Sequence, residues 1–308
     1  MRILIVASFN KSRFSPFVLE QAEAIKGAGC GVEFFGLQGK GMSGYLQNLL
    51  ALNKKIRGWH PDVIHAHYGL SGLLANLQRK VPVVTTYHGS DINDKKVLPF
   101  SKQAMRLSAW NVFVSQKTID LAYPKRNYSL LPCGIDMSDM QLTEKSEARQ
   151  KMHLSADKRY ILFAGAFDNA VKNATLAKQT VEALQDDNAE LLELKGYSRD
   201  EVTLLMCAAD TFLMTSLSEG SPQVIKEAMA CGCPIVSVDV GDVKERVEGL
   251  EGCYVAETRD PQELVQLLQK AMTLKGKTKG RERLVADGLD NNIVAQKLIS
   301  IYERVIKK

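Results

Sequence analysis

Two glutamates with seven residues between them, Glu219 and Glu227, enclose the most informative stretch of this chain. The intervening turn begins Gly-Ser-Pro-Gln, so that Ser221 can cap a helix and Pro222 can occupy its first position. The amides at the start of such a helix attract a phosphate or another anion. Carboxylates instead suit sugar hydroxyls. The pattern therefore indicates a ligand with hydroxyls on both sides of a diphosphate, as in a nucleotide-diphosphate sugar.

The elements expected around these residues belong to a parallel α/β sheet. The run Leu213–Ser216 predicts the end of a strand, and the following helix should reach about Cys231, where Gly232 suits a left-handed cap. Ile235–Val238 predicts a fully buried strand. A helix that begins at the carboxyl end of a strand lies where such sheets usually bind ligands. For either glutamate alone, a solvated surface acid is an equally good explanation.

Three histidines follow two other apolar runs that predict strands. His65 and His67 end the run PDVIHAH, and His88 follows VPVVTTY. Residues just past the carboxyl ends of parallel strands point into the same cleft, so these side chains indicate a polar site. The spacing of His, Cys and Asp predicts no metal site.

The stretch EGSPQVIKEAMACGCPIVSVDVGDVKE resembles the EGxPxVxxEAMAxGxPVV signature of the family-four retaining glycosyltransferases. YHGSD is similar to the HG-D element of that family, SPFVLEQAEAIKGAG to its SPFVxxQAxAL segment, and LPCGIDMSDM to IPNGVDxxxF, with Cys133 at the usual asparagine. The resemblance implies an α/β protein of the GT-B fold, with two Rossmann-like domains facing across a central cleft. It also implies retaining transfer of a hexose from a nucleotide-diphosphate sugar, with neither a cofactor nor a metal ion.

The resemblance further implies roles for individual residues. His88 would lie beside the transferred sugar, Glu219 would bind its hydroxyls, and Lys172 would neutralise the diphosphate as it leaves. The remaining donor-binding candidates are Gly220, Ser221, Pro222, Gln223, Glu227 for the ribose, and Tyr197 near the base. The acceptor-side candidates are His67, Ser8 and Asn10.

The chain departs from the family pattern at two places. Ala166 or Phe167 occupies the position of the usual diphosphate-binding arginine, and Ser8, Phe9 and Asn10 replace the glycines that usually follow the first strand. Losing one fixed charge could weaken donor binding by about 1–3 kcal/mol unless another basic group substitutes.

A length of 308 residues predicts two domains. We expect an N-terminal Rossmann-like acceptor domain over 1–150 and a nucleotide-sugar domain over 151–290, where the α/β alternation restarts. We expect residues 291–308 to form a helix that returns to the first domain, as the resemblance implies.

The charge is uneven along the chain. Residues 1–155 hold 20 Lys and Arg against 11 Asp and Glu, a net +9, whereas residues 156–308 hold 20 against 24, a net −4. The basic half suggests an anionic partner, such as a membrane surface, a lipid-linked acceptor or an acidic glycan. No nucleic-acid-binding motif accompanies the charge. The amphipathic stretch 45–57 ends in basic residues, and core packing explains it better than membrane docking.

The six scattered cysteines predict buried free thiols, and no apolar run is long enough to span a membrane. We therefore expect a cytoplasmic protein, with peripheral contact at the inner membrane face as a further expectation. Synthesis of a surface polysaccharide is the setting that the resemblance implies. Two alternatives stay open: a nucleotide-sugar epimerase on the same fold, and a non-catalytic sugar-nucleotide-binding protein.

Overall fold

The computed structural model describes residues 1–9, 12–39, 41–138 and 140–307, apart from the side chains of residues 41–46. The chain divides into two compact units, the first formed by Met1–Gly134 with Leu289–Lys308 and the second by Ile135–Gly288. The first unit ends earlier than the expected boundary at 150. Residues of α7 (Lys145–Lys151) fold with the second unit because Arg149 donates hydrogen bonds to the Ala208 carbonyl and the Asp210 carboxylate.

The first unit contains a six-stranded sheet in the order β2-β1-β3-β4-β5-β6, with every pair parallel. Its strands are β1 (Arg2–Ser8), β2 (Gly31–Leu37), β3 (Val63–His67), β4 (Val83–Tyr87), β5 (Trp110–Phe113) and β6 (Tyr128–Leu130). Its helices are α1 (Pro16–Gly27), α2 (Gly41–Trp59), α3 (Gly69–Asn76), α4 (Ser90–Asn93), α5 (Leu98–Leu107), α6 (Gln116–Ala122) and α14 (Asn291–Ile306).

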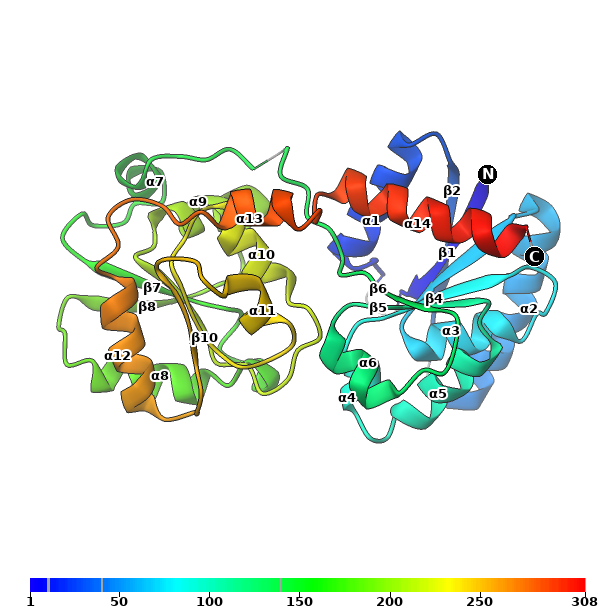
Figure 1. Cartoon of the computed structure of the whole chain (residues 1–308), viewed down its shortest axis with the longest axis horizontal. Coiled ribbons are helices and arrows are strands. Elements are labelled where there is room, and N and C mark those ends of the chain that lie inside the picture. Colours follow the sequence, from blue (N-terminus) through cyan, green and yellow to red (C-terminus); the bar gives the residue numbers. More distant parts are fainter. Residues whose placement is uncertain (10–11, 40, 139, 308) are drawn as a thin grey trace. The chain divides into compact units, whose positions relative to one another are not determined.

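Strand β1 shows how this sheet acquires two buried faces. Its odd-numbered residues, such as Ile5, pack against α1 and α14, whereas Leu4 and Val6 on the opposite face pack against α2 and α3. Helix α14 lies beside α1 although the two are separated by most of the chain (Figure 1). The C-terminal helix is therefore part of the core of the first unit.

The second unit contains a five-stranded parallel sheet in the order β11-β10-β9-β7-β8. Its strands are β7 (Arg159–Phe163), β8 (Ala189–Glu193), β9 (Thr211–Met214), β10 (Ile235–Val238) and β11 (Cys253–Ala256). After α7 come η1 (Ala170–Lys172), α8 (Ala174–Ala183), α9 (Arg199–Ala208), α10 (Gln223–Ala230), α11 (Val243–Val247), α12 (Pro261–Ala271) and α13 (Gly280–Ala286).

One expected helix start was wrong. Helix α10 begins at Gln223, its cap is the extended residue Pro222, and the Ser221 hydroxyl donates to the Asp242 carboxylate instead of capping the helix. The end of this helix is as expected, because Gly232 has a left-handed φ of +68°. Strand β10 also has the predicted bounds.

Two other expectations are confirmed. Leu52 and Ile56 of α2 are buried against the sheet, so this helix is a packed core helix. All six cysteines are free thiols, and five of them are buried. Within the described ranges, no helix is long and apolar enough to cross a bilayer.

Each sheet has a topological switch point, where successive strands stop adding to one side of the first strand and begin adding to the other side. In the first unit this switch lies between β1 and β3, and in the second it lies between β7 and β9. Parallel α/β sheets bind ligands just beyond the carboxyl ends of the strands at such a switch. Each unit therefore has a preferred location for a site.

Candidate active site

An ion pair lies at the switch point of the second unit. Lys172, at the end of η1, follows β7, and its Nζ donates to Glu219 Oε1 at 2.8 Å. Both side chains are largely buried, with 19% and 18% of their surface exposed. Gly165 makes room for the lysine, because a Cβ on this glycine would lie 2.9 Å from Lys172 Cγ. Two residues predicted from separate motifs are thus brought into direct contact.

The loops that carry this pair are connected by hydrogen bonds to backbone. Thr215, just after β9, donates to the carbonyls of Lys172 and Asn173, both at 2.9 Å. Arg259 donates to the carbonyls of Thr215 and Ser216. The loops that carry Lys172 and Glu219 are therefore held together by hydrogen bonds to backbone carbonyls.

The turn that precedes α10 is fixed by a buried carboxylate. Asp242 accepts from the Ser221 hydroxyl at 2.9 Å and from Arg246 Nε at 3.0 Å, and Arg246 also pairs with Asp287. Gly241 has φ +55°, and a Cβ there would lie 2.6 Å from the Gly220 carbonyl oxygen. Ser221 is thus oriented toward the protein interior by Asp242, which the sequence did not indicate as a site residue.

The other donor-side candidates lie on the same unit but differ in their surroundings. Gly220 and Pro222 are buried in the turn, while Gln223 and Glu227 lie half-buried on α10. Tyr197, in the loop after β8, is 42% exposed. Among the described residues, Tyr197 forms no hydrogen bond, ion pair or ring contact with another donor-side candidate, so it lies apart from the Lys172–Glu219 pair.

Three histidine rings lie together at the carboxyl ends of β3 and β4 in the first unit. His67 Nδ1 lies 3.0 Å from His88 Nε2, and their rings are stacked with centroids 5.2 Å apart. His88 Nδ1 lies 3.8 Å from the sulfur of Cys133. His67 Nε2 is buried and has no hydrogen-bond partner among the described residues. The predicted pair His67 and His88 is therefore a single hydrogen-bonded unit.

Burial keeps two of these rings neutral. It lowers the pKa of His67 to about 3, and it lowers the pKa of His65 well below its ordinary value, with the neighbouring histidines adding to the effect. His65 lies between Thr86 Oγ1 at 2.7 Å and the Tyr302 hydroxyl at 2.6 Å. His65 thus links β3 to the C-terminal helix.

A buried carboxylate holds the two histidine-bearing loops together. Asp91 accepts from the backbone N–H of Gly69 at 2.8 Å, and from those of His88 and Gly89, each at 3.0 Å. Burial raises the pKa of Asp91 to about 6, while these backbone N–H groups act in the opposite direction. Asp91 is a positioning residue that the sequence motifs did not single out, although it ends the YHGSD stretch that resembles the HG-D element.

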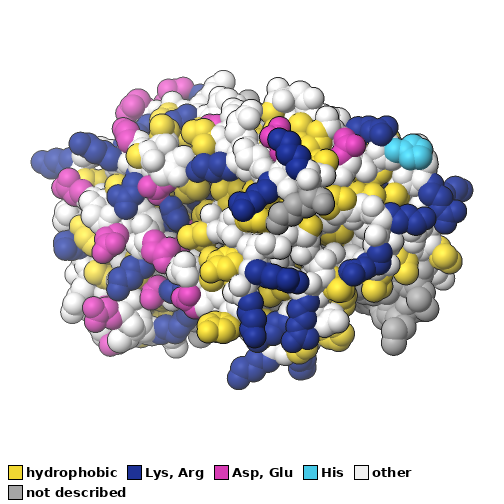
Figure 2. All heavy atoms as spheres, turned by 45° about the vertical axis from the view of Figure 1, so that its right-hand side comes forward, with side chains coloured by type: hydrophobic (Ala, Val, Ile, Leu, Met, Phe, Trp, Pro, Cys, Tyr) yellow, Lys and Arg dark blue, Asp and Glu magenta, His cyan; other side chains and the backbone are white. Residues whose placement is uncertain are grey.

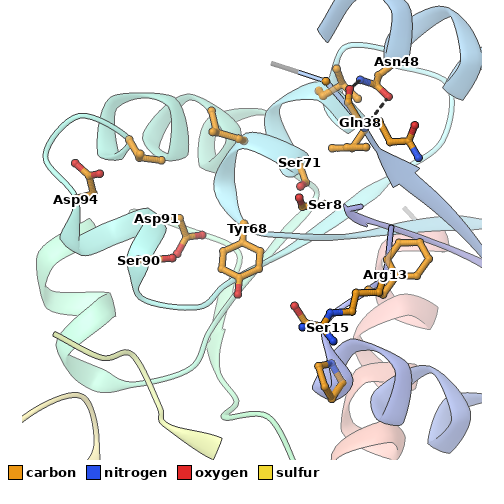
Figure 3. Close-up of a pocket in the computed structure, with 17 residues that line it drawn as sticks. Ser8, Arg13, Ser15, Gln38, Asn48, Tyr68, Ser71, Ser90, Asp91 and Asp94 are labelled. Atoms are coloured by element: carbon orange, nitrogen blue, oxygen red, sulfur yellow. Dashed lines mark hydrogen bonds between the residues drawn. The ribbon is translucent and has the colours of Figure 1, made fainter. Parts of the chain in front are cut away.

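A cavity of about 860 Å³ lies next to these loops in the first unit. Ser8, Tyr68 and Ser71 line its middle, with Arg13 on one side and Asp91 and Asp94 on the other (Figure 3). Of the acceptor-side candidates, Ser8 thus lies on the cavity, His67 is fully buried and is not among the lining residues, and Asn10 lies outside the described residues.

Two further lining residues had no signal in the sequence. Tyr68 adopts φ +73°, an unusual value for a bulky residue, and its ring lies 4.6 Å from that of His88. Arg13 forms no ion pair with any described residue and lines a cavity that also contains carboxylates. The cavity therefore offers a cation, hydroxyls and carboxylates, which are suitable partners for a polar ligand.

Models of two protein families match this chain. The model described as Glycosyltransferase Family 4 matches residues 16–139, and the model described as Glycosyl transferases group 1 matches residues 172–273. TuaC of Bacillus subtilis, named for glycosyl transfer in teichuronic acid biosynthesis, is 29% identical over 218 residues, which are 61% of this chain and 56% of TuaC. The chain therefore spans little more than half the length of this relative.

Solved structures confirm the GT-B class predicted for the fold. A sucrose-phosphate synthase from Thermosynechococcus elongatus superposes with a TM-score of 0.82 at 17% identity, covering 100% of this chain and 99% of the other. HepE from Anabaena, solved in complex with UDP, gives 0.77 at 16% identity, with 99% and 100% covered. At these identities the likeness concerns the fold alone.

Proposed function

Since the chain belongs to the family-four glycosyltransferases, we propose that it transfers a hexose from a nucleotide-diphosphate sugar to a glycan or lipid-linked acceptor. The synthesis of a surface polysaccharide is the proposed setting, as the name of its relative TuaC suggests. The observation that carries this proposal is the Lys172–Glu219 pair at the switch point of the second unit, next to the start of α10.

In the proposed mechanism, the diphosphate lies on the backbone amides that begin α10 and on the ammonium of Lys172. These groups stabilise the negative charge that develops as the nucleoside diphosphate leaves. When the phosphate takes over Lys172, the Glu219 carboxylate is released to accept hydrogen bonds from the sugar hydroxyls. Glu227, in the second turn of α10, accepts from the ribose hydroxyls.

The acceptor binds, in this proposal, in the cavity of the first unit, where Ser8 and Arg13 lie. His88 lines the transfer site, held by His67 and by the Asp91-linked loops. Transfer proceeds on the front face of the sugar with retention, as the acceptor hydroxyl gives its proton to the leaving phosphate. Lys172 and the amides supply the positive charge, so that we propose no role for a metal ion or a cofactor. Activity in excess EDTA would test this part.

The donor is found by thermal unfolding with UDP, GDP, ADP and their sugars, beginning with UDP because HepE was solved with it. A ligand at 100 times its dissociation constant adds about 2.7 kcal/mol of stability.

The variant Glu227→Ala should abolish transfer while its melting temperature without ligand stays unchanged. Glu182→Ala, which removes an exposed glutamate on α8 of the same unit, is the matched control. Full transfer activity in the Glu227→Ala variant would refute the assignment.

One observation favours a second function, sugar-nucleotide binding without catalysis. Phe167, near the position of the missing arginine, donates its N–H to Glu193, and the ammonium of Lys178 lies over its ring. Donor binding with neither transfer nor donor hydrolysis would support that alternative. Analysis of the product anomer by NMR would test retention separately.

A further inference from the structure

We propose that the first unit docks on a membrane containing anionic phospholipid through a surface built by α5, the end of α6 and β6. This α5–α6 surface surrounds a cavity of about 310 Å³, which is lined by the four cations Lys102, Arg106, Lys125 and Arg126. The biological purpose of docking rests on the proposed function, since a lipid-linked acceptor lies in a membrane. The surface itself is separate from the residues proposed for the reaction.

The four cations of this cavity have no acidic partners in the part of the chain that the structure describes. All four side chains are exposed, and none forms an ion pair with a carboxylate of the described residues. They belong to a unit that holds 21 Lys and Arg against 9 Asp and Glu, whereas the second unit holds 19 against 26. Such a concentration of unpaired positive charge favours an anionic group, and the cavity has room for the phosphate of a lipid headgroup.

Apolar side chains surround this charge. Leu121 and Tyr123, at the end of α6, are 55% and 78% exposed. Tyr128 and Leu130 of β6 are 42% and 44% exposed, and they lie on the α6 face of the sheet because the Tyr128 ring packs edge-on against Phe113. Figure 2 shows Lys and Arg side chains gathered on the lower part of one face, with hydrophobic side chains among them.

This combination favours a bilayer over an acidic glycan or a nucleic acid. Leucine and tyrosine beside lysine and arginine are typical of surfaces that enter the headgroup region of a membrane. A glycan would need amides or carboxylates to bind its hydroxyls. The amide side chain in the cavity wall, that of Asn111, already forms hydrogen bonds within the protein. Asn111 donates to the Met105 and Asn127 carbonyls and accepts from the Tyr87 hydroxyl.

The test is co-sedimentation of the full chain with vesicles of phosphatidylcholine, with and without phosphatidylglycerol. Near an anionic leaflet each cation contributes roughly a fivefold factor in binding, so the variant K102Q/R106Q/K125Q/R126Q should lose affinity by roughly two orders of magnitude or more. The control K54Q/R57Q/R79Q/K80Q removes four exposed cations of the same unit elsewhere and should bind nearly as the wild type does.

The apolar part is tested by L121S/Y123S, which keeps every charge. At 0.5 M salt, screening removes the electrostatic part of vesicle binding from both the wild type and this variant. The binding that remains in the wild type should be lost in the variant, because it comes from the apolar side chains. The proposal would be overturned if the control variant K54Q/R57Q/R79Q/K80Q lost vesicle binding to the same extent. It would also be overturned if the variant K102Q/R106Q/K125Q/R126Q still bound the vesicles. Binding of inorganic phosphate, acidic polysaccharide or RNA in place of vesicles would also overturn it.

Two results separate this proposal from the proposed reaction. The variant K102Q/R106Q/K125Q/R126Q should show the same thermal shift with the donor nucleotide as the wild type. This result would show that the variant is folded and binds the donor. Vesicle binding by a wild-type chain that shows no transfer would contradict the proposed reaction and leave membrane docking standing. Loss of vesicle binding alone would contradict docking and leave the reaction standing.

Discussion

Lys172 and Glu219 form an ion pair with each other, and this pairing affects how a donor diphosphate would bind. Their 2.8 Å contact means that a diphosphate must take over the ammonium from the carboxylate. Since the usual arginine position is occupied by Ala166 or Phe167, the proposed donor site would depend on Lys172 more than a site with two fixed cations would.

We therefore expect Lys172→Met to weaken binding of the donor nucleotide by about 1.5–3 kcal/mol, the contribution typical of a hydrogen bond to a charged group. Methionine preserves the stem that packs against Gly165, so that only the charge is lost. Isothermal titration calorimetry measures the change. Lys244→Met, on the exposed side of α11, is the control, and equal losses in both variants would contradict the role of Lys172.

Asp91 gives a prediction about pH. Its pKa in the folded chain, about 6, lies above the ordinary value of 3.8, so the folded chain takes up this proton first as the pH falls. The wild type should therefore gain stability relative to Asp91→Asn between pH 7 and pH 4, by up to about 3 kcal/mol. Urea unfolding of both proteins at each pH measures this difference, in which the buried histidines cancel. A difference independent of pH would contradict the burial argument.

At the scale of elements, the C-terminal helix completes the core of the first unit. Leu298 and Tyr302 of α14 are buried in the same cluster as Ile5 of β1 and Val18 of α1. The Tyr302 hydroxyl also provides the hydrogen bond to His65 Nδ1. The helix thus contributes both apolar packing and a polar contact beneath the histidine-bearing loops.

Tyr302→Phe should destabilise the first unit by about 1–3 kcal/mol, because it leaves a buried nitrogen of His65 without its partner. Tyr128→Phe, in which the same hydroxyl is removed from an exposed ring, is the matched control and should change stability by less than about 0.5 kcal/mol. Urea unfolding measures both changes. If Tyr302→Phe left the free energy of unfolding unchanged, the contact with His65 would add no net stability.

At the scale of the whole chain, there are two compact units, each with its own parallel sheet. Donor binding at the switch point of the second unit should therefore protect the amides of that unit that form the site. We expect slower hydrogen exchange with UDP, or whichever nucleotide binds, in peptides covering 165–173, 215–227 and 240–246. Mass spectrometry reads this directly, with peptides of β11 as the internal control. Protection confined to the first unit would contradict the assignment of the donor site.

Much of the site was predictable because it is local in sequence. The strand–turn–helix pattern around Glu219 and Glu227 places both acids without any long-range information, and Gly232 follows from the left-handed cap that ends α10. The start of that helix was not predictable. Whether Ser221 caps α10 or donates to Asp242 depends on a loop that the sheet order brings alongside.

The sequence alone determined the α/β class, the bounds of several strands and helices, the family and the residues of its motifs, because hydrophobic periodicity and capping act over a few residues. The tertiary structure alone decided which distant side chains meet. His65 and Tyr302 are 237 positions apart, and Lys172 and Glu219 are 47 apart. The basic cavity likewise combines α5 with residues 125–126. Such contacts depend on strand order and helix packing, which no local pattern encodes.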